Sequence, residues 1–171
     1  MASKWYSEQP VNRNFLAPSG FKMNLDIFGG IDFFCQKASI PDISVGFAEA
    51  PTRYRGIPIV SSGGLTYGDL RLKFIVDEDI KNYLTVHKWI TQNNLAEELD
   101  TKKLPEYSNG QLEILNSNFK TNIIIVFENL FPIDLSALEF DVEDTNVEYL
   151  TADVTYKFER YYFTDKNNTR L

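Results

Sequence analysis

The sequence has very little of the side-chain chemistry on which many enzymes and metal sites depend. Its 171 residues include one cysteine, Cys35, and one histidine, His87. A single cysteine excludes a disulfide within the chain and favours a reducing compartment. One cysteine and one histidine also cannot supply the four such ligands that a structural zinc site needs. We therefore expect neither a disulfide framework nor a zinc site.

Long hydrophobic runs are missing as well. The longest continuous apolar run, residues 123–127, has the length of a strand and falls far short of the roughly 20 residues of a membrane helix. The first residues carry no apolar run of the kind found in a signal peptide. We expect a protein that is made and folds in the cytosol without membrane insertion.

Basic residues are outnumbered by acidic ones. The chain has 17 lysines and arginines against 24 aspartates and glutamates, a formal charge of −7. Such a balance lacks the bulk signature of a nucleic-acid-binding protein. A local basic strip formed by Arg53, Arg55, Arg71 and Lys73 stays open, although solvated surface charges explain these residues more simply. The apolar content of 43% is sufficient for one folded domain.

The strongest local pattern is a strand that runs directly into a helix. Apolar and basic residues alternate over residues 70–76, which predicts a half-buried strand. Asp77 is placed where a helix N-cap belongs, and Glu78 and Asp79 add negative charge at the positive end of the helix dipole. We expect the helix to bury one face and to be anchored to a sheet through Trp89, Ile90, Leu84 and Ile80. That face comprises Ile80, Tyr83, Leu84, His87 and Ile90.

Most other segments read as strands. Alternation or continuous apolar character predicts strands at 21–27, 31–38, 43–47, 111–115, 120–127 and 147–163. Gly29-Gly30 predicts a tight hairpin between the first two, and Pro41 should end the second. Residues 129–136, with Pro132, are expected to form a connection. The last predicted strand exceeds the usual length of about 5–6 residues.

These elements predict a mainly β fold in a single domain over residues 1–171. The architecture that we expect is a small antiparallel β-sandwich or barrel with one flanking α-helix. Residues 1–20 read as an N-terminal arm. Residues 49–65 read as a long irregular excursion, either an extended loop or a hairpin that engages a partner.

No constellation of residues suggests catalysis or a cofactor. We expect His87 to be a packed or partly exposed ring and Cys35 a small buried hydrophobic residue. The acidic residues 77–79 are explained by a helix start, and the glycine pairs at 29–30 and 63–64 lack the helix and lysine of a phosphate loop. We therefore expect no catalytic, cofactor-binding or metal-binding residue, and no enzyme.

A second acidic cluster is formed by Glu139, Asp141, Glu143 and Asp144. Its spacing differs from that of a calcium-binding loop, so a solvated acidic surface is the simpler interpretation. A carboxylate-based hydrolase around Glu143 remains an alternative, and it would need two carboxyl groups held roughly 5–10 Å apart in a cleft.

The order of these segments resembles the tail tube proteins of contractile phages and their baseplate tube-initiator relatives. The first matching segment is Phe33-Phe-Cys-Gln-Lys-Ala-Ser-Ile-Pro-Asp-Ile43, a strand that ends at a small residue, an aliphatic residue and a proline. The second covers the strand and acidic helix start at 70–79 and continues to Trp89-Ile90. The third pairs residues 127–135, with the turn Asn129-Leu-Phe-Pro132, with the closing strand at 149–163.

The resemblance implies a structural subunit of a phage tail tube. It implies hexameric rings of β-sandwiches that stack into a hollow conduit for DNA delivery into the host. The implied partners are further copies of the chain, a sheath protein, a tape-measure protein and baseplate proteins, with DNA present only in transit. The implied location is the virion tail, assembled in the host cytoplasm. Residues 54–59 and the arm at 1–20 are the expected contacts between rings.

Elementary physical arguments agree with this interpretation. Ring formation would pair the exposed edges of a small sandwich and close them into a barrel. An acidic wall would repel DNA phosphate, so that DNA could pass without binding.

Three further alternatives stay open. Within the same class, the chain could be a baseplate tube-initiator or cap subunit, or the tube of a phage-like secretion machine. From a different class, a monomeric β-barrel that binds a small apolar ligand would have a similar strand content.

Overall fold

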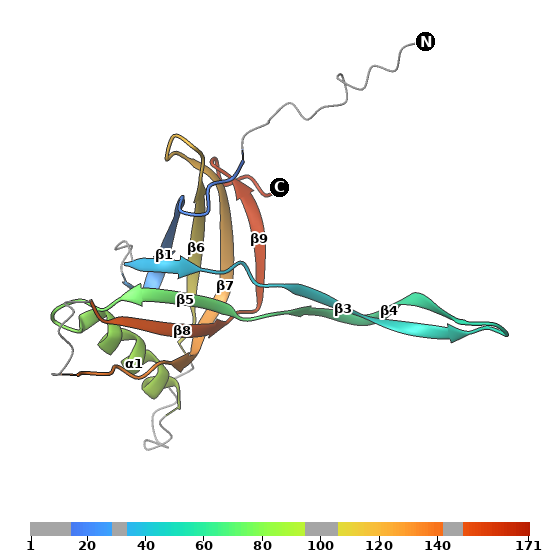
Figure 1. Cartoon of the computed structure of the whole chain (residues 1–171), viewed down its shortest axis with the longest axis horizontal. Helices are drawn as coiled ribbons and strands as arrows, with labels where there is room; N and C mark the ends of the chain where they lie inside the picture. The colour runs from blue at the N-terminus through green and yellow to red at the C-terminus, as the bar shows by residue number, and fades with distance from the viewer. Residues whose placement is uncertain (1–14, 29–33, 95–105, 142–148) are drawn as a thin grey trace, which may run out of the picture.

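The computed structural model describes residues 15–28, 34–94, 106–141 and 149–171 (Figure 1). The described part is mainly β with one α-helix, which confirms the predicted class. Its strands are β1 (Phe21–Leu25), β2 (Cys35–Ala38), β3 (Ile43–Pro51), β4 (Gly56–Tyr67), β5 (Leu70–Ile75), β6 (Ser108–Leu115), β7 (Thr121–Leu135), β8 (Thr151–Lys157) and β9 (Arg160–Asp165). Its helices are the short 3₁₀ helix η2 (Asp26–Phe28) and α1 (Lys81–Asn94).

The body is built from two antiparallel sheets that share the long strand β7. The first half of β7 pairs with β6 and β9, and β1 adds to the outer side of β6. The second half of β7 pairs with β8, followed by β5 and then β2. In Figure 1, β6, β7 and β9 run upright while β2, β5 and β8 run across them. The sheets therefore form an open, crosswise sandwich with free edges.

The core fills the space between the two sheets. Alternate residues of β5 and β8 point inward and are buried, as the sequence pattern predicts. The largest fully buried side chains include Trp89 from α1, Tyr156 from β8, Phe74 from β5 and Phe127 from β7. The ring of Trp89 contacts that of Tyr156, with centroids 6.0 Å apart. The helix thus covers one end of the sandwich and joins its core.

The helix begins later than predicted and buries a partly different face. Asp77 accepts a bond from the N–H of Asp79 within a turn, rather than capping α1. Ile80, with φ at 56°, interrupts the helical phase immediately before α1. Within α1, Val86 and Trp89 are buried and Tyr83 and Ile90 pack against the core, while Leu84 and His87 are exposed. The predicted anchoring by Trp89 and the predicted packing of Tyr83 and Ile90 are confirmed. The predicted place of Leu84 and His87 on the buried face is wrong.

The hairpin predicted around Gly29-Gly30 does not form between the strands that flank it. β1 pairs with β6, whereas β2 pairs with β5 in the other sheet. The glycines themselves lie outside the described residues. The pattern failed because two glycines signal a turn without specifying which strands the turn joins.

Two further strand boundaries differ from prediction. β7 continues through Pro132, which was expected in a connection, with a register shift between Pro132 and Asp134. Conversely, the single strand predicted at 147–163 is two strands, β8 and β9, which pair with different parts of β7. The break falls at 158–159, where the chain passes from one sheet to the other.

No helix in the described ranges is both long enough and apolar enough to cross a membrane.

Candidate functional site

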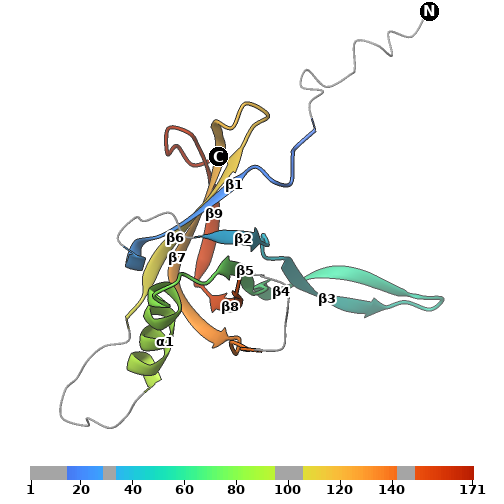
Figure 2. The same ribbon diagram turned by 60° about the vertical axis from the view of Figure 1, so that its left-hand side comes forward.

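The most prominent surface feature is a hairpin that projects from the body. β3 and β4 pair only with each other and form a separate two-stranded sheet. Figures 1 and 2 both show this hairpin extending well beyond the sandwich. The segment at 49–65, for which an irregular loop and a hairpin were both considered, is thus part of a hairpin that begins at Ile43 and ends at Tyr67.

The root of the hairpin is fixed to the body by aromatic packing. The ring of Tyr67 contacts those of Phe158 and Tyr161, with centroids 5.6 and 5.3 Å apart. The Tyr161 hydroxyl donates to the carbonyl oxygen of Pro41 at 3.2 Å. Partial burial raises the pKa of Tyr161, and Tyr67 and Asp42 raise it further, which keeps this donor protonated.

The hairpin root also depends on one close backbone approach. The N–H of Gly68 donates to the carbonyl oxygen of Asp42 at 2.9 Å. A Cβ atom at Gly68 would lie 1.9 Å from a carboxylate oxygen of Asp42. Because glycine has no Cβ atom, Gly68 allows β3 and β4 to leave the body side by side.

A large bulge divides the hairpin into two parts. Between the pairs Val45–Leu65 and Phe47–Val60, the register advances by two residues on β3 and by five on β4. Gly64, with φ at 94°, lies in this bulge. Beyond it, residues 47–51 pair with residues 56–60. We call residues 47–60 the distal arm.

The distal arm exposes apolar side chains on both of its faces. Phe47 and Val60 are cross-strand partners and are 68% and 90% exposed. Ile59, opposite Ala48 on the other face, is half exposed. A lone two-stranded ribbon is at best marginally stable in water. Exposed apolar surface of this kind marks an interaction site.

The tip of the distal arm is a tight, basic turn. The N–H of Thr52 donates to the carbonyl oxygen of Arg55 at 3.1 Å, and the N–H of Arg55 donates to the Thr52 hydroxyl at 3.2 Å. The Arg53 guanidinium lies 5.8 Å from the ring centre of Tyr54. Arg71 and Lys73 lie on β5 in the body, so the basic strip considered from the sequence is split between two places.

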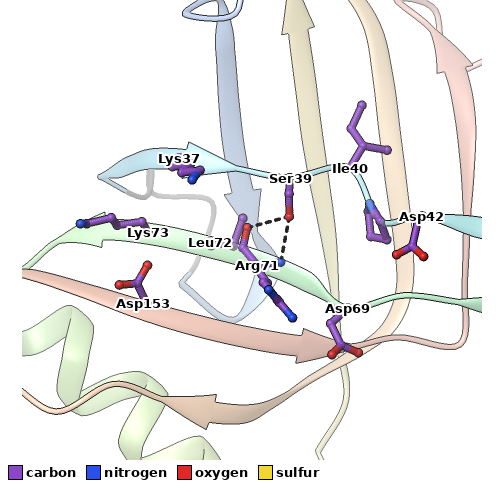
Figure 3. A pocket seen from close by; sticks show the side chains of 10 residues that line it. Lys37, Ser39, Ile40, Asp42, Asp69, Arg71, Leu72, Lys73 and Asp153 are labelled. Carbon is purple, nitrogen blue, oxygen red and sulfur yellow. Dashed lines mark hydrogen bonds between the residues drawn. The ribbon is translucent and has the colours of Figure 1, made fainter.

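A second candidate surface is the outward face of the sheet β2–β5–β8–β7. We call this the open face, because the opposite face packs on the core. It holds a shallow polar groove of about 470 Å³ (Figure 3). Lys37, Arg71, Lys73 and Asp153 lie along it, and Ser39 ties the end of β2 to the backbone of Arg71.

The groove is lined by charged surface side chains, some of which are already paired. Asp69 at its end forms an ion pair with Lys157 at 2.5 Å. No cluster of three or more His, Cys, Asp or Glu side chains capable of holding a metal ion is found among the described residues. Burial raises the pKa of the Cys35 thiol to about 11, so it stays protonated at neutral pH. The exposed His87 lies on α1 and does not line the groove.

The acidic cluster singled out from the sequence is only partly described. Glu139 and Asp141 are exposed in the segment after β7. Glu143 and Asp144, on which the hydrolase alternative depended, lie outside the described residues.

Sequence reasoning placed a candidate contact at 54–59 but missed Phe47 and Val60, the most exposed apolar pair of the distal arm. The signal that could have found them is the apolar pattern across residues 43–60, which carries Val45, Phe47, Ile57, Ile59 and Val60 without a helix or strand to cover them. The prolines and glycines in this stretch obscured it.

Comparison with known proteins identifies the group to which this chain is related. The family model "Phage tail tube protein" matches residues 9–164. The tail tube terminator protein of Enterobacteria phage T4 is 33% identical over 132 residues, which cover 72% of this chain and 73% of that protein.

Solved structures share the fold at low sequence identity. A chain from the tube-terminating cap of the anti-feeding prophage superposes with a TM-score of 0.69 at 18% identity, covering 96% of this chain and 99% of its own. A chain from the sheath/tube terminator of the PVC extracellular contractile injection system gives 0.66 at 17% identity, covering 91% and 99%. A chain from the PVC sheath–tube complex gives 0.65 at 16% identity, covering 90% and 93%. The chain belongs to the phage tail tube protein family.

Proposed function

We propose that this chain is the tail tube terminator of a contractile phage, a ring-forming subunit that closes one end of the tube. The observation that carries a docking role is the distal arm, which presents apolar side chains on a ribbon with no covering partner in the described chain. The terminator role is supported by the relative from phage T4 and by the similarity to two terminator structures.

Ring formation is supported by the edges of the two sheets. β2 and β1 are edge strands, and the last part of β7 pairs on one side only, with β8. Unpaired edges invite association with another chain. A head-to-tail contact repeated around an axis closes them into a ring. We propose a hexamer, in keeping with the family resemblance.

The distal arm is proposed to seat on the tube. Its root is fixed to the body by Tyr67 and Tyr161, so the arm has a defined direction before it binds. Apolar side chains on both faces suit insertion between two partner surfaces. We also propose that the ring contacts the sheath and that DNA passes through it. The excess of acidic residues in the chain disfavours DNA binding during this passage.

A main tube subunit is the second candidate. It is favoured by the superposition on a chain of the PVC sheath–tube complex, whose TM-score of 0.65 is close to those of the two terminator structures.

Addition of the purified chain to growing tubes separates these roles. The tube subunit of the same particle is polymerised in vitro, and the labelled chain is added at increasing concentration. A terminator shortens the tubes and labels their ends only. A main tube subunit lengthens them and labels their walls.

The arm-deleted variant provides the control for docking. Replacing residues 46–64 by an Asn-Gly turn keeps the root ladder and removes the distal arm. We expect this variant to fold but to leave tube length unchanged. Shortened tubes with this variant would show that the arm does not mediate docking.

The small-ligand alternative lacks support in the described residues. The space between the sheets is filled by side chains such as Trp89 and Tyr156, and the groove of the open face is lined by charged residues rather than by an apolar wall. Apolar ligands bind in concave, mostly apolar cavities.

A further inference from the structure

The charges of the open face are divided between its two halves. Lys37 on β2 and Lys73 and Arg71 on β5 are cationic, whereas Asp153 on β8 and Asp134 on β7 are anionic. The register shows that they share a face. In one row across the strands, Lys37 is opposite Lys73, which is opposite Asp153. In another row, Arg71 is opposite Thr155, which is opposite Asp134. Lys157 on β8 and Asp69 beside β5 have the opposite signs, but they neutralise each other in an ion pair. The remaining charges leave the β2 edge basic and the β7 edge acidic.

The two edge charges have no partner in the described structure. Lys37 and Asp134 are both exposed. Neither forms an ion pair among the described residues, where the salt bridges are Lys81–Asp79, Lys157–Asp69 and Arg160–Glu128.

The position of Lys37 is unfavourable in an isolated subunit. It lies directly opposite Lys73 on the neighbouring strand, and like charges in this position destabilise a sheet. Asp153 compensates Lys73 from the other side. Lys37 lacks such compensation, which an acidic group beyond the β2 edge would supply.

The topology permits a second copy to supply that group. The strand order is β2–β5–β8–β7, with every neighbouring pair antiparallel. Because the number of strands is even, the first and last strands run in opposite directions. A second copy placed edge to edge therefore continues the antiparallel alternation, with its β2 beside the second half of β7.

Pro132 makes side-chain contacts important at this edge. Proline has no N–H and is confined largely to edge strands and bulges. Here it precedes a register shift, and Ile133 and Asp134 are exposed beside it. A backbone ladder alone would be incomplete there, so complementary side chains must contribute to specificity.

We propose that the ring closes through a seam in which Lys37 of one copy pairs with Asp134 of the next. The occupant of each exposed edge is a second copy of this chain, bound head to tail. This inference rests on the proposed ring function and adds to it the two edges and the ion pair that select them.

Charge reversal tests the seam. We expect Lys37→Glu and Asp134→Lys each to lower the ring fraction by at least about tenfold, because like charges then meet at every seam. The double variant Lys37→Glu/Asp134→Lys restores opposite charges and should recover rings. Native mass spectrometry and sedimentation velocity measure the ring fraction, and circular dichroism verifies that each variant is folded.

Mixing the two single variants gives a sharper result. In a ring that alternates them, Asp134 meets Lys37 at one seam, and the lysine introduced at 134 meets the glutamate introduced at 37 at the next. Two variants that fail separately should therefore form rings together in a 1:1 ratio. A loss of folding cannot produce this recovery.

The controls reverse charges elsewhere on the body. Lys120→Glu lies in the turn between β6 and β7, and Asp26→Lys lies in η2; both positions are exposed. These variants should form rings like the unaltered chain.

The outcomes separate the seam from the proposed function. If the unaltered chain forms rings and the single reversals form them equally well, or if mixing gives no recovery, the seam is wrong while the ring function stands. If the unaltered chain stays monomeric even with tube ends present, both are overturned.

Discussion

The side-chain amide of Asn82 donates to the carbonyl oxygen of Ile75 at 2.8 Å and so ties the first turn of α1 to the end of β5. The amide oxygen of Asn82 accepts bonds from the N–H groups of Asp77 and Tyr83 at 3.2 and 2.8 Å. One half-buried side chain therefore supports the whole turn between strand and helix. It performs the role that the sequence assigned to Asp77.

Replacing this side chain tests that role. Asn82→Ala removes a donor and an acceptor, and we expect it to lower the free energy of unfolding by about 1–3 kcal/mol. Lys81→Ala, one residue earlier on an exposed position, should change it by less than about 0.5 kcal/mol. Urea denaturation measures both. Equal stability of the two variants would show that Asn82 does not hold the turn.

The helix should depend on Trp89 more than on any exposed residue. Trp89 is buried, contacts Tyr156 and donates from its indole N–H to the carbonyl oxygen of Glu106 at 2.7 Å. Trp89→Ala should lower the free energy of unfolding by about 3–5 kcal/mol. Leu84→Ala, on the exposed side of the same helix, should cost less than about 1 kcal/mol by the same measurement. A similar cost for both substitutions would contradict the observed helix face.

Two tyrosines should respond in opposite directions to loss of the hydroxyl group. The Tyr156 hydroxyl is fully buried and has no hydrogen-bond partner among the described residues. Tyr156→Phe should therefore raise the free energy of unfolding by about 1–2 kcal/mol. Tyr161→Phe removes the bond to Pro41 and should lower it by about 0.5–1.5 kcal/mol. A loss of stability in Tyr156→Phe would mean that this hydroxyl is satisfied.

Alkaline pH should weaken the protein in part through Cys35. Burial raises the pKa of its thiol from 9.0 to about 11, with bonds to the backbone of Lys37 and Lys73 opposing the shift. The neutral thiol is thus favoured in the folded state. Its contribution to stability is complete below pH 9 and is lost as the pH rises through about 11.

Denaturation midpoints at pH 8, 9, 10 and 11 measure this dependence. We expect a steeper fall between pH 9 and 11 in the unaltered chain than in Cys35→Ala, and slow alkylation of Cys35 at pH 8 unless the chain is unfolded. Rapid alkylation of the folded chain at pH 8 would show an accessible thiolate.

The distal arm should matter for assembly and not for the stability of a single subunit. Phe47→Ser and Val60→Ser alter exposed side chains, so the free energy of unfolding should change by less than about 0.5 kcal/mol. Binding to tube ends should be lost, because apolar contact area is lost. Lys120→Ser on the body is the control and should bind normally. Normal tube binding by both arm variants would assign docking to another surface.

The parts of the fold that could be predicted are those with one buried face. Leu70, Leu72 and Phe74 alternate with Arg71 and Lys73 because β5 separates the core from water. A period of two then identifies both the strand and its inward residues. The same pattern correctly identified β1 and β8, and a continuous apolar run identified the start of β7.

The parts that could not be predicted depend on contacts distant in sequence. In the sequence, Pro132 indicates a connection between strands. An edge strand tolerates proline, however, and only the pairing with β8 shows that this part of β7 is an edge strand. Ile80 gives no sign that its φ is positive. The helix face was misread because the spacing of apolar residues alone does not fix which side of the helix turns towards the sheet.

The candidate assembly surfaces could be predicted only in part from the sequence. Residues 49–65 were predicted to leave the body as a loop or hairpin, yet the pairing of Phe47 with Val60 beyond a bulge requires the register. Likewise, the charges of Lys37 and Asp134 are unremarkable in the sequence. They become complementary edges only when the strand order is known.

Cryo-electron microscopy of the purified chain mixed with tail tubes of its own particle tests the central claim most directly. We expect one ring of this chain at one end of each tube, with the distal arm in contact with the last tube ring. Bare tube ends beside free monomers would contradict the account.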